Sequence, residues 1–180
     1  SDEVVGVYTL YYSISNLVQI FVDTGVAAVL YPKMVEAYNR EKMREYRALF
    51  RKLASQVTSV GLLIALAMGS SIYPILWILD NPLYLQDIKV YWILLIAAIV
   101  AGVGLIPHYA LYACREDQII IGSVLAGLLV SLAVNALLVQ TYGMMGAAVA
   151  YLSAMTVITG IKFIAWLNKS SKLTQKTYKK

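Results

Sequence analysis

The chain has 180 residues, of which 60% are hydrophobic and only 14% are charged, and its net charge is +5 at pH 7. This composition, with a mean hydropathy of +0.69, excludes a water-soluble globular domain and is typical of an integral membrane protein. The positive charge does not indicate nucleic-acid binding, because the Lys and Arg residues concentrate between apolar runs. The single cysteine, Cys114, excludes an internal disulfide and a metal site built from several cysteines.

Five apolar runs are each long enough to cross a bilayer, whose hydrocarbon core of about 30 Å requires about 20 helical residues. They cover residues 4–31, 54–79, 90–113, 118–140 and 144–167. Because lipid offers the backbone no hydrogen-bond partner, each run is predicted to be a helix. The predicted fold class is therefore an all-α membrane protein. Residues 1–168 form its five transmembrane helices, and residues 169–180 form a basic cytoplasmic tail.

The distribution of Lys and Arg predicts the orientation in the cell membrane. Seven of them lie between the first two runs, one follows the third run and five follow the fifth, whereas the opposite side has only Lys89. Cytoplasmic loops are enriched in these residues, so the N-terminus is predicted to be outside and the C-terminus cytoplasmic. The chain is thus predicted to begin outside and to cross the membrane an odd number of times. This is expected of a piece of a longer protein whose other spans lie upstream.

Residues 34–53, between the first two runs, combine apolar side chains at helical spacing with many charges. Val35, Tyr38, Leu49 and Leu53 belong to the apolar set. The pattern predicts a basic amphipathic helix in the cytoplasmic headgroup region. The alternative is a solvated connector that continues into the second transmembrane helix.

The first run contains the most informative polar residues of the chain. Tyr12, Asn16, Gln19 and Asp23 are spaced four, three and four apart, which places them on one face of a helix. A charged group at this depth costs about 2.5–3.5 kcal/mol, so it normally faces a cavity or a partner. We expect this face to line a hydrated substrate cavity. The alternative is a polar seam between two packed helices.

Two further residues complete the predicted substrate cavity, Asn135 in the fourth run and Lys162 in the fifth. Each has a simpler alternative, since Asn135 could hydrogen-bond between helices and Lys162 could extend its ammonium group to the headgroups. His108, the only histidine, is predicted to pack at an interface, with proton transfer as the alternative. No catalytic motif is present, so neither an enzyme nor a metal site is predicted.

Several short motifs follow one another along the chain and suggest a family. They are VGVY at 5–8, VLYPKM at 29–34, LYA at 111–113, Asn135, and YGMMGAA at 142–148. This ordered set resembles polysaccharide flippases of the multidrug/oligosaccharidyl-lipid/polysaccharide exporter superfamily. The resemblance covers nearly the whole chain and implies a partial C-terminal lobe of a MATE-like flippase, with a missing N-terminal lobe as its partner.

The resemblance implies a transporter that flips an undecaprenyl-linked oligosaccharide across the cytoplasmic membrane by alternating access. Its partners would be the lipid-linked sugar and membrane lipids. No cofactor is predicted, and a coupling cation, H⁺ or Na⁺, is the one candidate. The alternatives are a cation-coupled multidrug antiporter, a membrane glycosyltransferase or polymerase of the same pathway, and a small structural membrane subunit. An antiporter would need an acidic cluster, whereas Asp23 is the only carboxylate within the five runs.

Overall fold

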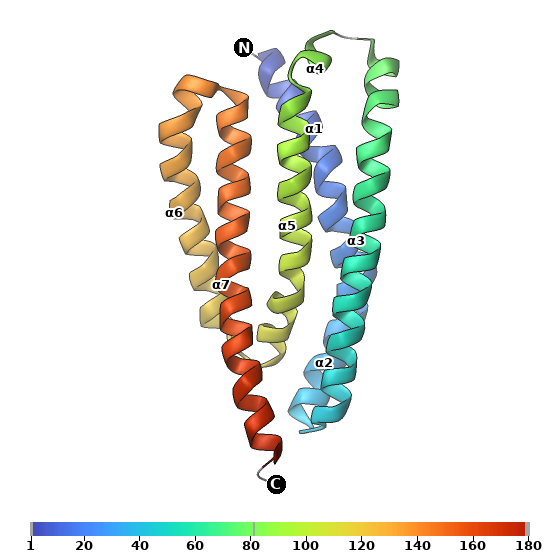
Figure 1. Cartoon of the computed structure of the whole chain (residues 1–180), viewed down its shortest axis with the longest axis vertical. Coiled ribbons are helices and arrows are strands. Elements are labelled where there is room, and N and C mark those ends of the chain that lie inside the picture. Colours follow the sequence, from blue (N-terminus) through green and yellow to red (C-terminus); the bar gives the residue numbers. More distant parts are fainter. Residues whose placement is uncertain (1, 81, 179–180) are drawn as a thin grey trace.

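The computed structural model describes residues 2–80 and 82–178, and every regular element within them is a helix (Figure 1). The elements are α1 (Asp2–Val22), the π-helical segment η1 (Asp23–Ala27), α2 (Ala28–Asn39), α3 (Met43–Leu79), α4 (Pro82–Gln86), α5 (Ile88–Ala113), α6 (Asp117–Tyr142) and α7 (Met144–Tyr178). Among the described residues, five helices are long and apolar enough to cross a membrane. The predicted all-α chain with five candidate spans is confirmed at this level.

The first spanning helix is longer than the first apolar run. α1, η1 and α2 follow one another without a break as far as Asn39, beyond the predicted end at residue 31. Pro32 lies inside α2, where it removes a single backbone donor without ending the helix. The fifth span is longer too, because the backbone of α7 stays helical to Tyr178 through most of the predicted tail at 169–180. The last two residues of that tail lie outside the described part.

The segment predicted as one amphipathic helix, 34–53, is instead divided between α2 and α3 by a tight turn. Glu41 adopts the left-handed conformation, with a φ of 56°. The N–H of Lys42 donates to the carbonyl oxygen of Ala37 at 3.0 Å, and the N–H of Glu41 donates to that of Tyr38 at 3.0 Å. This pair of bonds is the Schellman arrangement, which usually uses glycine at the left-handed position. Because a glutamate occupies this position, the sequence has no glycine here that would have indicated the turn.

The helix at the centre of the bundle is α5. It packs against α1 and α3 on one side and against α7 on the other, and α6 packs mainly on α7 (Figure 1). In its most apolar window 67% of the residues are buried, against 11% for α6. Its buried residues include many small ones, which let neighbouring backbones approach closely. They include Ala97, Ala98, Ala101, Gly102, Gly104 and Ala110.

Glycines in two helices make close contacts that a larger residue would prevent. A Cβ atom on Gly104 of α5 would lie 2.5 Å from the Oγ1 of Thr159 on α7. A Cβ atom on Gly127 of α6 would lie 2.4 Å from Cγ1 of Ile158, also on α7. α7 therefore sits against both neighbours at distances that depend on these two glycines.

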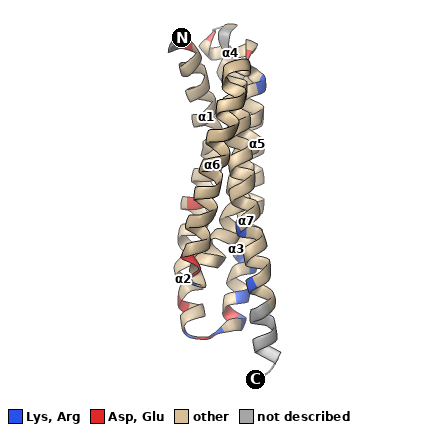
Figure 2. Cartoon of the chain, turned by 90° about the vertical axis from the view of Figure 1, so that its left-hand side faces the viewer, with Lys and Arg blue, Asp and Glu red and all other residues tan. Residues whose placement is uncertain are grey.

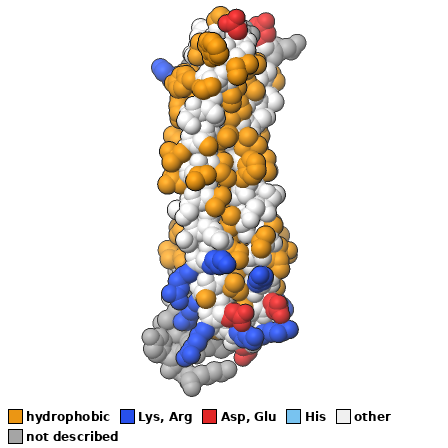
Figure 3. All heavy atoms as spheres, turned by 90° about the vertical axis from the view of Figure 1, so that its right-hand side faces the viewer, with side chains coloured by type: hydrophobic (Ala, Val, Ile, Leu, Met, Phe, Trp, Pro, Cys, Tyr) orange, Lys and Arg blue, Asp and Glu red, His pale blue; other side chains and the backbone are white. Residues whose placement is uncertain are grey.

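Charged side chains gather at the two ends of the bundle and leave an apolar belt between them (Figure 3). Lys and Arg residues concentrate toward the end that carries the C-terminus, near the α2–α3 and α5–α6 turns (Figure 2). The opposite end carries α4 and the α6–α7 turn, where Gly143 has a φ of +54°. This arrangement agrees with a chain that crosses a membrane several times, and the predicted orientation makes the basic end cytoplasmic.

The orientation can be tested with single cysteines at the two ends of the bundle. In a Cys114→Ala background, Gln86→Cys should react with a membrane-impermeant maleimide added to intact cells, because the basic end is expected to be cytoplasmic. Arg44→Cys should react only after the cells are permeabilised. Labelling of Arg44→Cys in intact cells would show that the bundle has the opposite orientation.

Packing around α6 and α7 can be tested with two glycines of the same helix. Gly127→Val should lower the thermal midpoint in detergent, because overpacking of a filled interface costs about 1–3 kcal/mol. Gly122→Val is the matched control, since a Cβ atom at Gly122 meets nothing within 4 Å. Equal midpoints for the two variants would contradict the close contact between Gly127 and Ile158.

Candidate functional site

The polar residues of the first span form a stripe beside the face that α1 buries. The buried face consists of Val7, Tyr11, Ser15, Val18 and Val22. Each stripe residue follows a buried one by one position, about 100° around the helix, and each is half-buried; the stripe consists of Tyr12, Asn16, Gln19 and Asp23. We call these four residues the α1 stripe. It borders the packed interior instead of lying inside it.

The outer end of the α1 stripe meets α7. The rings of Tyr12 and Tyr151 contact each other edge to face, with a centroid distance of 5.4 Å. α1 and α7 both pack on α5, so this aromatic contact joins two helices that are held together mainly through α5. The α1 stripe therefore meets α7 at Tyr12.

The inner end of the α1 stripe is Asp23, which begins the π-helical segment. The N–H of Ala28 donates to the carbonyl oxygen of Asp23, a five-residue step that widens the helix by one residue. The hydroxyl of Tyr109 on α5 donates to Oδ1 of Asp23 at 2.5 Å. Tyr109 also stacks on Tyr31 at 5.3 Å. The carboxylate is thus held against α5 by a tyrosine that is itself fixed by an aromatic neighbour.

A histidine lies beside the tyrosine that holds this carboxylate, and a buried lysine interacts with that histidine. His108 contacts Tyr109 ring to ring at 5.1 Å and interacts electrostatically with both Asp23 and Lys162. Lys162, on α7, is only 9% exposed. We call Asp23, His108, Tyr109 and Lys162 the inner polar cluster. It draws ionisable side chains from η1, α5 and α7 to one level of the bundle.

The inner polar cluster is not internally satisfied. Nδ1 of His108 is buried and has no hydrogen-bond partner in the described part of the chain. Lys162 forms no ion pair with any described residue. A cation inside a membrane-spanning bundle costs about 2.5–3.5 kcal/mol, so such residues normally pair or face a wet pathway. The cluster can therefore accept an anionic or hydrogen-bonding group from outside the described residues.

The middle of the α1 stripe is also free to bind. Asn16 and Gln19 make no hydrogen bond with another described residue, and both are half-buried. Side-chain amides in membrane helices normally find a partner. Asn16 and Gln19 can therefore hydrogen-bond to water or hydroxyl groups between the inner polar cluster and the contact of Tyr12 with Tyr151.

The sixth predicted cavity residue lies elsewhere. Nδ2 of Asn135 on α6 donates to the carbonyl oxygen of Ser131, one turn earlier on the same helix, at 2.8 Å. α6 packs chiefly on α7 and makes little contact with α5. The structure therefore brings Asp23 and Lys162 to one cluster and Tyr12, Asn16 and Gln19 to one stripe, and it separates Asn135 from both.

Two residues of the site have no counterpart among the predicted cavity residues. Tyr109 and Tyr151 both face the α1 stripe from other helices. Tyrosines are common at membrane surfaces, so neither stood out in the sequence. The one signal that the sequence offered for Tyr109 was its position directly after Pro107 and His108. His108 itself was expected to pack at an interface. Within the described residues, no group of three metal-ligating side chains is close enough to hold a metal.

Comparison with known proteins adds no relative: no family model, curated protein or solved structure matches the chain. The likeness to polysaccharide flippases rests on the sequence motifs alone.

The bond between Tyr109 and Asp23 can be tested by removing one hydroxyl. Tyr109→Phe should destabilise the protein by about 1–3 kcal/mol, because a half-buried carboxylate loses its hydrogen bond. Tyr112→Phe is the matched control on the same helix, since Tyr112 is 46% exposed. Thermal midpoints in detergent compare the two. A midpoint for Tyr109→Phe equal to that of Tyr112→Phe would show that the bond contributes nothing.

Proposed function

We propose that the chain is one lobe of a transporter that flips a lipid-linked, phosphate-bearing sugar across the cytoplasmic membrane. The observation that carries the proposal is Lys162, a buried cation that interacts electrostatically with His108 and forms no ion pair with any described residue of this membrane-spanning bundle. A buried cation of this kind marks a substrate or ion pathway more often than a structural contact. It suits the phosphate groups of a substrate whose hydrocarbon tail stays in lipid.

The α1 stripe supports a sugar-bearing substrate. From Asp23 to Tyr12 it extends about 16 Å along the helix axis at 1.5 Å per residue. Its amides and phenols are groups that hydrogen-bond to hydroxyls, and Asn16 and Gln19 are without partners among the described residues. Phosphates near Lys162 and sugars along the α1 stripe would follow the same seam between α1 and α7.

The proposed mechanism is alternating access between this lobe and a second lobe of the same protein. One wall of a cavity can bind a headgroup, but transport needs an opposing wall that moves against it. The chain would then act as a binding surface without covalent chemistry. A coupling cation, H⁺ or Na⁺, would enter at Asp23, the only carboxylate within the predicted spans.

One observation favours a second candidate, a cation-coupled multidrug antiporter. Asp23 is held by Tyr109 in a π-helical segment, and π-helical turns often occur at functional sites. A bundle whose predicted spans hold one carboxylate, Asp23, and a buried lysine, Lys162, suits an anionic substrate better than a cationic drug. We therefore favour the flippase.

Transport by the complete gene product in proteoliposomes tests the flippase. The probe is a fluorescent polyprenyl diphosphate-linked sugar, whose flipping exposes the label to an impermeant reductant. Lys162→Gln should slow flipping by about tenfold or more, because a contact between a cation and a phosphate is worth about 1.5–3 kcal/mol. Lys162→Arg should retain most of the rate.

Lys89→Gln is the matched control, because Lys89 is an exposed lysine at the opposite end of the bundle. An unchanged rate in Lys162→Gln at normal protein abundance would refute the role of Lys162. Gradient-driven dye efflux that disappears in Asp23→Asn would support the antiporter in place of the flippase.

A further inference from the structure

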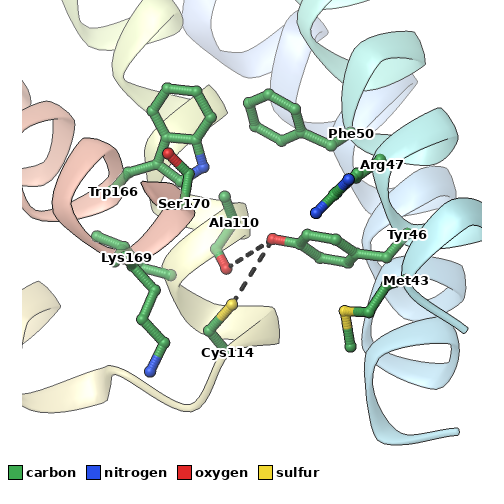
Figure 4. Close-up of a pocket in the computed structure, with 10 residues that line it drawn as sticks. Met43, Tyr46, Arg47, Phe50, Ala110, Cys114, Trp166, Lys169 and Ser170 are labelled. Carbon is green, nitrogen blue, oxygen red and sulfur yellow. Dashed lines mark hydrogen bonds between the residues drawn. The ribbon is translucent and has the colours of Figure 1, made fainter. Parts of the chain in front are cut away.

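A cavity of about 260 Å³ lies at the basic end of the bundle, between α3 and α7 (Figure 4). α3 contributes Tyr46 and Phe50 to its walls, the end of α5 contributes Leu111, and α7 contributes Trp166 and Lys169. None of its lining residues belongs to the α1 stripe or to the inner polar cluster. We call this space the α3–α7 cavity.

Two stacked rings close the end of the α3–α7 cavity that faces the membrane interior. Phe50 of α3 stacks on Trp166 of α7, with a centroid distance of 4.7 Å and an interplanar angle of 23°. α3 leads away from the basic end, so Phe50 lies one turn deeper than Tyr46, and α7 leads toward that end, so Trp166 lies deeper than Lys169 (Figure 1). Figure 4 shows the two rings at one end of the cavity, with Lys169 and Met43 toward the other.

The other end of the α3–α7 cavity is polar and within reach of solvent. Lys169 and Glu116 form an ion pair there, and each of the two side chains is 30% exposed. The hydroxyl of Tyr46 lies 3.4 Å from the carbonyl oxygen of Ala110 and 3.7 Å from Sγ of Cys114 (Figure 4). One water needs only about 10–15 Å³ of such a volume and a few polar partners. The cavity can therefore hold several water molecules that enter from the basic end.

The inner polar cluster begins one turn beyond the closed end of the cavity. Lys162, Trp166 and Lys169 are spaced four and three apart, which places them on one face of α7. Lys162 follows Trp166 into the bundle by about 6 Å at 1.5 Å per residue. On α5, His108 precedes the lining residue Leu111 by three positions and shares its face. The stack of rings thus lies between the cavity and two groups that lack described partners, the ammonium of Lys162 and the buried Nδ1 of His108.

We propose that the α3–α7 cavity is the cytoplasmic part of a water-filled route to Lys162, and that the stack of Phe50 on Trp166 is its gate. The gate is closed in the structure, because the two rings are in contact. When the rings separate, water reaches the ammonium group and supplies the partner that no described residue provides. The proposal rests on the proposed function for the role of Lys162, since water would replace the substrate phosphate after its release.

Access to position 162 can be measured with a thiol. Lys162→Cys in a Cys114→Ala background is exposed, in inside-out membrane vesicles, to the impermeant reagent sulfonatoethyl methanethiosulfonate, and the rate of modification is followed. Adding Phe50→Ala should raise this rate by about twofold to tenfold, the factor that corresponds to the free energy of one aromatic pair. An unchanged rate in folded protein would overturn the proposal.

Two further variants separate the gate from a general loosening of the bundle. Phe21→Ala is the matched control, because Phe21 is 53% exposed on α1 and lines no part of the cavity; it should leave the rate of modification unchanged. Phe50→Leu keeps an apolar side chain but cannot stack, so it should raise the rate by a smaller factor and decides the matter if Phe50→Ala does not fold. Equal rates for the Phe21 and Phe50 variants would show that the stack is not a gate.

The side from which the reagent acts identifies the route. Faster modification in the Phe50 variants should occur only from the side on which Arg44→Cys is labelled, because the cavity lies at that end of the bundle. Acceleration from the opposite side would mean that the reagent arrives along the α1 stripe, which would overturn the route. The flipping assay with Lys162→Gln is independent of this result: slow flipping without faster modification would overturn the gate and leave the proposed function standing.

Discussion

Close packing of α5 is the constraint on which the rest of the bundle depends. In lipid there is little hydrophobic drive between helices, so association depends on how closely their surfaces fit. α5 supplies that fit with small residues on its buried faces, and Gly104 admits Thr159 of α7 where any larger residue would collide. Thr159 in turn donates to the carbonyl oxygen of Val100 at 3.3 Å. The contact between α5 and α7 is therefore held by shape and by a hydrogen bond.

The polar site follows from this thin central helix. α1 and α7 lie on opposite sides of α5, yet Tyr12 and Tyr151 come into ring contact. His108 reaches both Asp23 and Lys162 electrostatically. A central helix with bulkier side chains would separate α1 from α7 and break both connections. The same small residues that stabilise the bundle thus set the spacing across which a ligand would bind.

Hydropathy and charge were enough to predict the helices that cross the membrane, because both depend on average composition over about 20 residues. They could not locate the turn at Glu41, where a glutamate adopts a conformation that glycine normally marks. They also could not reveal the π-helical segment that begins at Asp23. Local conformations of this kind depend on tertiary contacts, which produce no periodic pattern in the sequence.

The candidate site was predictable only in part, for a related reason. Helical spacing places Tyr12, Asn16, Gln19 and Asp23 on one face regardless of the fold, and that much the structure retains. Which residues oppose them depends on how α5 and α7 are rotated, and a single sequence carries little information on rotation. Asn135 was expected at the cavity, yet it bonds to its own helix, whereas Tyr109 and His108 were not expected there.

Two aromatic contacts connect the α1–α3 side of the molecule to α7, at different levels of the bundle. Toward the basic end Phe50 stacks on Trp166, and toward the opposite end Tyr12 meets Tyr151. Lys162 lies between these two contacts on α7 and interacts electrostatically with His108 of α5. A rotation of α7 about its axis would break both ring contacts and move Lys162, so the aromatic contacts fix the position of the lysine in the bundle.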